Sequence, residues 1–236
     1  MAIGDGELRR GFHDRMSAIH ARTGETITTL AGAGDAVLAA AVGETEPDAA
    51  LADVLATDAR VDALLEWLEG EVFDLVARQS PVGRDLRFLT ASLRIGQALE
   101  RVGDLLVSTG RRVEVVRPLV AGHGLEGPLR RLGDGALDLL RRAGAAYAVF
   151  DAEAASQLAA DDDAVDAAHG ELRRQLFSLG EVPAEPVVEL SMVGRFFERV
   201  ADHAVVMGER VCFIASGVMN PGDADESTVW AGPDDP

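Results

Sequence analysis

Apolar residues recur at spacings of three and four along most of the chain, and strict alternation of apolar and polar residues is rare. Spacings of three and four place side chains on one face of a helix, whereas alternation is typical of a half-buried strand. The stretches with this pattern are rich in Ala, Leu, Arg and Glu, which all have high helix propensity. The pattern therefore predicts an all-α protein.

Glycine, proline and capping residues divide this pattern into six predicted helices. Gly43 ends the first helix, and Pro47 suits the first turn of the second. Ser80 and Pro81 resemble an N-cap followed by proline at the first helical position, which predicts the start of the third helix. Asp151 is the predicted cap of the fifth. We expect helices over residues 7–42, 47–79, 81–116, 129–149 and 151–179, and a sixth from the break at residues 183–186 to residue 216, before Gly217.

The two halves of the chain repeat one another. The segment LERVGDLLVSTGRRV, which begins at Leu99, matches FERVADHAVVMGERV, which begins at Phe197, and DARVD in the first half matches DDAVD in the second. A repeat of the same residues on corresponding helices indicates a duplicated unit. We expect two tandem three-helix bundles, at 1–120 and 121–217, with a Gly/Pro-rich link at 117–128. The acidic tail, 218–236, has little to bury and is expected to be disordered.

Charge and hydropathy narrow the classes of function. The 40 acidic residues outnumber the 22 basic ones and give a net charge of −18, which disfavours binding to nucleic acid or to anionic lipid. No apolar run approaches the roughly 18 residues of a membrane span, and the N-terminus has no apolar signal core. The expected location is the cytoplasm. The single cysteine, Cys212, lies in an apolar run and is predicted to be a buried structural thiol.

Four pairs of acidic residues spaced four apart are the candidate sites for chemistry. This spacing places both carboxylates of a pair on one helix face, one turn apart. The pairs recur at matching positions of the repeat and fall within apolar stripes. Glu100 and Asp104, for example, share a helix face with Leu89 and Val107. The pairs are Asp58 with Asp62, Glu100 with Asp104, Asp162 with Asp166, and Glu198 with Asp202.

Like charges one turn apart repel, and burial raises that cost, so a proton, an arginine or a metal cation must compensate. Two pairs on neighbouring helices would form an oxygen-rich cage that suits hard cations. Divalent or ferric ions (Mg, Mn, Fe or Zn) are therefore the candidate cofactors. The alternative is a solvated or arginine-paired helix surface, which is common in so acidic a chain. The spacing alone favours that alternative, the repeat favours the cage, and both stay open.

Further candidates for catalysis are few. His203 follows Asp202 directly, about 100° round the helix, so both residues cannot easily face one ion. No phosphate-binding loop, nucleophile elbow, zinc pattern or dinucleotide fingerprint occurs, and we expect no enzyme. A carboxylate-bridged di-iron oxidase or metal-storage bundle is the alternative function, although the Glu-x-x-His pairs of such sites are missing. A purely structural helical protein is a third reading.

The motifs together resemble those of the PhoU family over about residues 8–217. They are SPVGRDLR from Ser80, LERVGD from Leu99, FERVADH from Phe197, and the DARVD and DDAVD segments. The resemblance implies two three-helix bundles, a cytoplasmic location and frequent dimerisation. It also implies that the four acid pairs hold metal clusters. Ser108 and Val206 stand where the family often has Asn.

The resemblance implies a regulatory role as well. Members of the family restrain phosphate uptake and phosphate-starvation signalling by linking a phosphate ABC transporter to a sensor histidine kinase. The expected partners are the transporter's ATP-binding subunit, the kinase and a second copy of the chain. Nucleic acid is not expected, and membrane contact is expected only through these partners.

Overall fold

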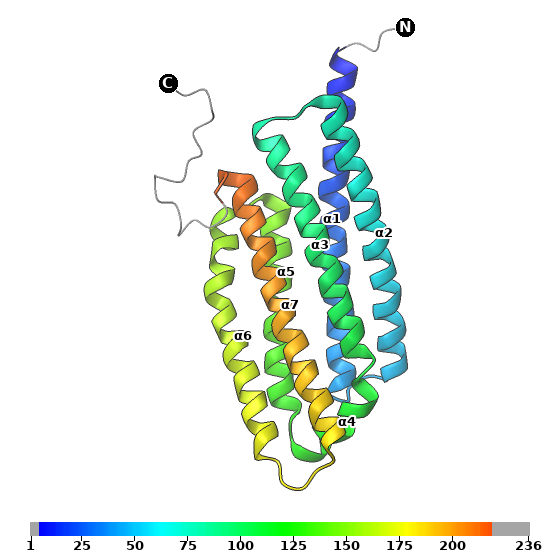
Figure 1. The fold of residues 1–236 in the computed structure, drawn as a ribbon, viewed down its shortest axis with the longest axis vertical. Helices are drawn as coiled ribbons and strands as arrows, with labels where there is room; N and C mark the ends of the chain where they lie inside the picture. The colour runs from blue at the N-terminus through cyan, green and yellow to red at the C-terminus, as the bar shows by residue number, and fades with distance from the viewer. Residues whose placement is uncertain (1–4, 219–236) are drawn as a thin grey trace.

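Helices form nearly all of the computed structural model, which describes residues 5–218 and contains no strand within them (Figure 1). All-α architecture was the sequence prediction, and it is confirmed. The predicted disordered tail falls, apart from Val218, outside the described residues. Within 5–218 there are seven helices: α1 (Asp5–Ala41), α2 (Pro47–Gln79), α3 (Gly83–Gly110), α4 (Val113–His123), α5 (Glu126–Val149), α6 (Ala152–Ser178) and α7 (Ala184–Ser216).

The six long helices form two three-helix units, as predicted, and the structure places the units side by side. One unit contains α1, α2 and α3, and the other contains α5, α6 and α7 (Figure 1). The units meet along α3 and α7, which pack together over a long seam, and along α1 and α5 behind them. Their buried side chains form one continuous hydrophobic core, with fully buried residues such as Leu68, Leu99, Tyr147 and Phe197. The shared core makes the two units one folding body.

Several helix ends follow the local signals in the sequence. α2 begins at Pro47, and the carboxylate of Asp151 accepts a hydrogen bond from the Ala154 amide at 3.0 Å and so caps α6. Gly43 and Gly217 adopt positive φ angles of 89° and 85° just after α1 and α7. This backbone conformation suits glycine and ends a helix. The lone thiol of Cys212 is buried, as expected, and its Sγ lies 3.4 Å from the carbonyl oxygen of Ala152.

The predicted N-cap at Ser80 is wrong. Ser80 has the left-handed backbone conformation (φ 45°) and its N–H donates to the carbonyl of Val76, so it ends α2 instead of starting α3. The N-cap residue of α3 is Val82. Only residues 80–82 connect the two helices, and one residue cannot be both a left-handed C-cap and an extended N-cap. Ser80 is the C-cap of α2 and therefore cannot be the N-cap of α3.

The predicted irregular link at 117–128 is also wrong. Most of it is α4, which contains Pro118 and ends at Gly124, where φ is 67°. Val116 and Val120 are fully buried, so packing against the core holds this short helix despite the proline. The predicted third helix, 81–116, is consequently divided: α3 ends at Gly110 and α4 begins at Val113. The predicted boundary between the units at residue 120 falls inside α4.

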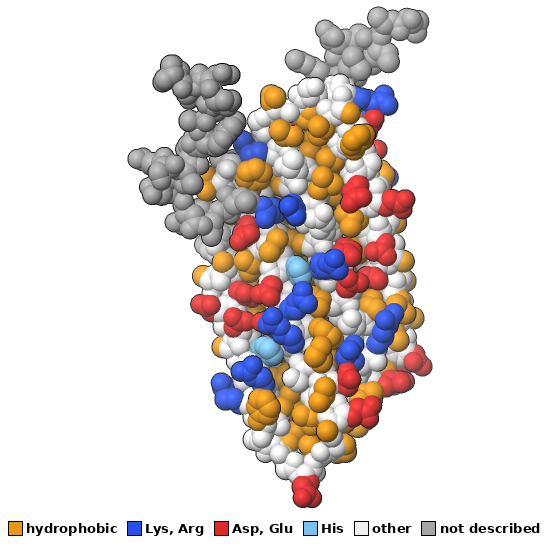
Figure 2. Space-filling view, viewed as in Figure 1, with side chains coloured by type: hydrophobic (Ala, Val, Ile, Leu, Met, Phe, Trp, Pro, Cys, Tyr) orange, Lys and Arg blue, Asp and Glu red, His pale blue; other side chains and the backbone are white. Residues whose placement is uncertain are grey.

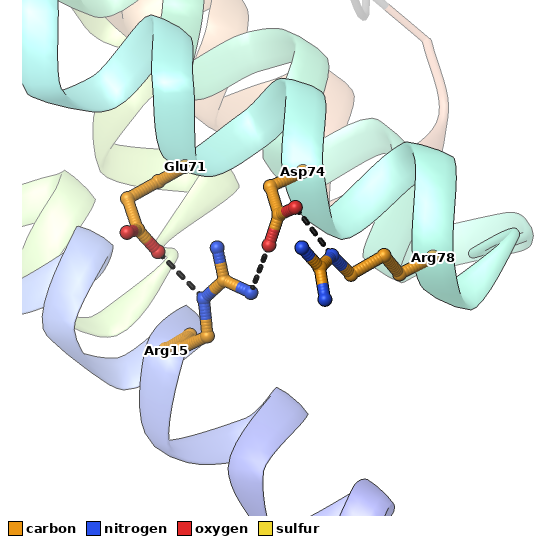
Figure 3. A network of polar contacts seen from close by, with 4 residues as sticks. All are labelled: Arg15, Glu71, Asp74 and Arg78. Atoms are coloured by element: carbon orange, nitrogen blue, oxygen red, sulfur yellow. Dashed lines mark hydrogen bonds and ion pairs between the residues drawn. The ribbon is translucent and has the colours of Figure 1, made fainter.

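A network of charged side chains joins α1 to α2 (Figure 3). Arg15 on α1 donates from Nε to Glu71 at 2.6 Å and from Nη1 to Asp74 at 2.7 Å, and Asp74 also accepts from Arg78. Hydrogen bonds from Arg15 and then Arg78 hold the pKa of Asp74 below its ordinary value. One guanidinium that binds two carboxylates loses side-chain entropy once for two contacts, which favours a network over separate pairs.

Candidate functional site

The eight predicted acidic residues form two clusters, one in each unit. The first cluster contains Asp58 and Asp62 of α2 with Glu100 and Asp104 of α3. Burial raises the pKa of Asp58, and the negative charges of the other three carboxylates raise it further. Mutual repulsion of this kind requires the four groups to be near neighbours. The structure thus brings together the pairs that the sequence places on separate helices.

A small residue on α3 makes room for the first cluster. The carboxylate of Asp58 lies directly against the backbone of Gly103, and a Cβ atom at residue 103 would collide with Asp58 Oδ1. The equivalent residue of the second unit is Ala201, so the two clusters are not copies in detail. Sequence reasoning missed this role of Gly103, although the difference between LERVGD and FERVAD was its visible signal.

The second cluster contains Asp162 and Asp166 of α6 with Glu198 and Asp202 of α7. Burial, followed by the charges of Asp202, Asp166 and neighbouring Asp163, raises the pKa of Asp162 to about 6. Burial also raises the pKa of Glu198, which is only 8% exposed, and the charge of Asp202 adds to this effect. Burial is therefore the main cause of both pKa shifts, and repulsion between the carboxylates adds to it.

Two oxygen atoms in the second cluster are buried without a hydrogen-bond partner among the described residues: Asp162 Oδ1 and Glu198 Oε2. Buried polar atoms of native proteins are almost always paired. A cation or a proton at this place would satisfy both atoms. The donor set, carboxylate oxygen alone, fits hard cations such as Mg or Mn and also ferric iron.

One arginine contacts each cluster. Arg101 lies 3.3 Å from Glu100 Oε2 and 3.3 Å from Asp104 Oδ2, and Arg195 contacts Glu198 Oε1. The arginine-paired surface that the sequence left open is therefore present in part. These guanidiniums leave Asp58 and Asp162 without an ion pair among residues 5–218.

The clusters lie at the edges of the apolar stripes. In each pair one carboxylate is buried or half-buried, and its partner one turn away is exposed; the exposed members are Asp62, Asp104, Asp166 and Asp202. Among the described residues, no group of three or more His, Cys, Asp or Glu side chains already has the spacing of a metal site. The carboxylates are gathered in two places but are not pre-arranged around an ion.

Histidines and arginines separate the two acidic groups. Figure 2 shows basic and histidine side chains along the middle of this face, with acidic side chains on both sides. His203 is half-buried in a groove between α3 and α7, where it lies with Gln97 and Arg101 of α3. Burial and then the positive charge of Arg199 lower the pKa of His203, while the negative charge of Asp202 partly opposes this shift. His169 is likewise half-buried, and burial and Arg173 lower its pKa.

Comparison with known families gives a match to the family model described as PhoU domain, which occurs twice, at residues 35–113 and 129–211. Curated relatives of the chain include proteins named phosphate-specific transport system accessory protein PhoU homolog 1. The relative from Mycobacterium tuberculosis (strain ATCC 25618 / H37Rv) is 32% identical over 233 residues, which cover 92% of this chain and 98% of the relative. The relative from Mycobacterium leprae is 30% identical over 217 residues, which cover 89% of this chain and 95% of the relative.

Two solved structures share the fold. PhoU from Pseudomonas aeruginosa superposes with a TM-score of 0.71 at 22% identity and covers 89% of this chain and 97% of its own. The phosphate transport system regulatory protein PhoU from Streptococcus pneumoniae superposes with a TM-score of 0.78 at 18% identity, over 88% of this chain and 98% of its own. None of the helices within residues 5–218 combines the length and apolarity that crossing a membrane requires.

Proposed function

This chain belongs to the PhoU family, and on that premise we propose that it is an accessory protein of a phosphate-specific transport system. Its role is to restrain phosphate uptake and phosphate-starvation signalling. The observation that carries the proposal is that the family model matches the chain twice, once in each unit. The match to named relatives, which covers almost their whole length, supports it. The proposed location is the cytoplasm, where the chain reaches the membrane only through its partners.

The protein acts by binding and has no turnover of its own. Its proposed partners are the ATP-binding subunit of the transporter, the sensor histidine kinase and a second copy of the chain. The surface is acidic, with a net charge of −18, so basic faces on the partners would speed association. Binding should therefore weaken as ionic strength rises.

Exposed phenylalanines support a role in partner binding. Phe73 near the end of α2 is 77% exposed, and Phe177 near the end of α6 is 81% exposed. They occupy equivalent positions in the two units, because each lies 15 residues after the first aspartate of its cluster (Asp58 and Asp162). Large aromatic side chains contribute strongly to protein interfaces and gain nothing from exposure to water. We infer that each phenylalanine docks onto a partner.

The two carboxylate clusters are the proposed cation sites. Asp58, Asp62, Glu100 and Asp104 would hold one cluster of divalent or ferric ions (Mg, Mn, Fe or Zn), and Asp162, Asp166, Glu198 and Asp202 the other. A bound cation would supply positive charge that cancels the repulsion between carboxylates. The unpaired oxygens of Asp162 and Glu198 support this assignment. Such a cation would tie α2 to α3 and α6 to α7.

Deletion of the gene tests the regulatory role. Phosphate-starvation genes should then stay on in phosphate-rich medium, and expression of the intact chain should restore repression. Phe73→Ser and Phe177→Ser should fail to restore it and should no longer retain the transporter subunit or the kinase in a pull-down. Val149→Ser, which alters a side chain that is 74% exposed elsewhere, is the matched control and should restore repression. Normal repression in the deletion strain, with any second copy of the gene also removed, would refute the proposal.

A further inference from the structure

A groove of about 410 Å³ lies between α1 and α2, and none of the eight clustered carboxylates lines it. Its volume is within the range of small-molecule sites, roughly 300–1,000 Å³. Two arginines, Arg22 from α1 and Arg60 from α2, line it together with Trp67 and Thr57. The groove thus combines cationic side chains with an aromatic surface, in a chain that is otherwise strongly acidic.

The two guanidiniums have no carboxylate partner within the described chain. Arg22 lies over the ring of Trp67, with Cζ 4.1 Å from the ring centroid, and Arg60 donates from Nη2 to the buried hydroxyl of Thr57 at 3.0 Å. Neither forms an ion pair among residues 5–218. An arginine stacked on an aromatic ring keeps its N–H groups directed outward in the guanidinium plane, ready for an anion.

Hydroxyl groups supply acceptors beside these donors. Thr26 donates to the carbonyl of Arg22 at 2.8 Å, and Thr29 donates to the carbonyl of Glu25 at 2.8 Å. Each hydroxyl donates its proton to a carbonyl of its own helix. Its oxygen keeps a lone pair that can accept a hydrogen bond from a ligand. The carboxylate of Glu25 also lines the groove and accepts hydrogen bonds. A ligand that matches both sets of groups has an anionic end and hydroxyl or amino donors.

The second unit lacks this combination. At the corresponding place between α5 and α6 is a smaller groove of about 180 Å³, in which Asp161 replaces Thr57 and Ala164 replaces Arg60. Asp161 is paired with Arg142. The repeat therefore supplies an internal comparison: where the first groove has Thr57 and Arg60, the second has an ion-paired aspartate and an alanine.

We propose that the groove between α1 and α2 binds a small phosphate monoester that carries hydroxyl groups, with its phosphate held by Arg22 and Arg60 and its hydroxyls by Thr26 and Thr29. Two guanidiniums match the charge and the oxygens of a phosphate dianion. A single phosphate leaves much of the groove empty, which favours an ester over the free ion. This inference goes beyond the proposed function and does not depend on it.

Fluorescence of Trp67 reports binding at the groove. The chain has two tryptophans, so the measurement uses Trp230→Phe, in which Trp67 is the sole emitter, and calorimetry on the unchanged chain repeats it. The probes are glucose 6-phosphate, AMP, inorganic phosphate and glucose. At least one monoester should bind saturably, and at least about tenfold more tightly than inorganic phosphate or glucose, because each of these two probes has only one of the two groups, phosphate or hydroxyl-bearing sugar, that the groove would hold.

Variants locate the site. Arg22→Gln and Arg60→Gln should each weaken monoester binding at least tenfold while they keep the melting temperature. Arg131→Gln in the groove of the second unit is the matched control and should bind like the original chain. Absence of a signal for both monoesters in fluorescence and in calorimetry would overturn the proposal. So would equal affinity for inorganic phosphate, or unchanged binding by both arginine variants.

Discussion

The carboxylate of Asp58 occupies the space that a side chain at Gly103 would fill. The contact places the Asp58 carboxylate against α3 at the first cluster and leaves Asp58 half-buried among other acids. The second unit has Ala201 at the equivalent position, so there the space is already taken. The residue at position 103 therefore affects both the packing of α2 against α3 and the surroundings of the Asp58 carboxylate.

A double-mutant cycle tests this relationship. Gly103→Ala should stabilise the chain by about 1 kcal/mol in an Asp58→Ala background, because alanine is the better helix former. In the original background the gain should be smaller, since the Asp58 carboxylate must rotate away from the new methyl group. Urea unfolding of the four proteins measures the difference. Equal effects of Gly103→Ala in both backgrounds would show that the two residues do not interact.

Asp162 should make the chain less stable as pH rises. Its folded-state pKa, about 6, lies above the ordinary value of 3.8, so the folded state disfavours the charged carboxylate. The penalty is absent below about pH 4, grows between pH 4 and 6, and is complete above pH 6. Asp162→Asn should therefore raise the melting temperature at pH 7.5 by about 2–4 °C, on the order of 1 kcal/mol after solvent screening, and by nothing at pH 4.

Asp14→Asn is the control for this comparison, because Asp14 is exposed on α1. It should change the melting temperature little at either pH. A stabilisation by Asp162→Asn that is the same at pH 4 and pH 7.5 would contradict a charge effect at residue 162.

Metal ions should raise the melting temperature of chelator-treated protein. A cation that binds only the folded state stabilises it in proportion to the logarithm of its concentration. Asp202→Asn should reduce this response and Asp104→Asn should reduce it as well, because the two residues belong to different clusters. The combined variant should lose it. A melting temperature that changes neither with chelator nor with added Mg, Mn, Fe or Zn would refute the cation sites.

Removal of Arg15 should destabilise the chain at neutral pH. Arg15→Gln breaks the contacts with Glu71 and Asp74 between α1 and α2 (Figure 3). The depressed pKa of Asp74 means that its contribution is present above the ordinary value of 3.8 and is lost as pH falls through the folded-state pKa. The melting temperatures of Arg15→Gln and the original chain should converge as pH falls below 3.8. A constant difference across that range would indicate lost packing instead of lost charge.

Ser80→Gly should stabilise the chain by about 1 kcal/mol, because glycine adopts the left-handed C-cap conformation without the strain of a Cβ atom. Ser80→Ala should have little effect, since the serine hydroxyl makes no N-cap hydrogen bond to α3. Unfolding in urea measures both variants. A loss of about 1 kcal/mol in Ser80→Ala, the size expected for a deleted N-cap, would contradict this assignment.

The sequence alone determined the features that depend on a few adjacent residues or on repetition. The cap at Asp151, the stops at Gly43 and Gly217 and the proline start at Pro47 need only local backbone geometry, so their signals survive without knowledge of the fold. The duplication was likewise visible in the sequence, because corresponding positions of the two units have similar surroundings and so carry similar residues. The family resemblance followed from the same repeated motifs.

Tertiary structure decided what depends on contacts between distant residues. Packing of Val116 and Val120 makes a helix of a segment whose glycines and proline predicted a link. The acid pairs lie at the edges of the apolar stripes because of the way α2 packs against α3 and α6 against α7. Helical spacing alone does not determine which helix becomes the neighbour of a pair. The meeting of Arg22 with Trp67 across two helices had no local signal at all. Side chains 45 residues apart become neighbours only when the helices that carry them pack together.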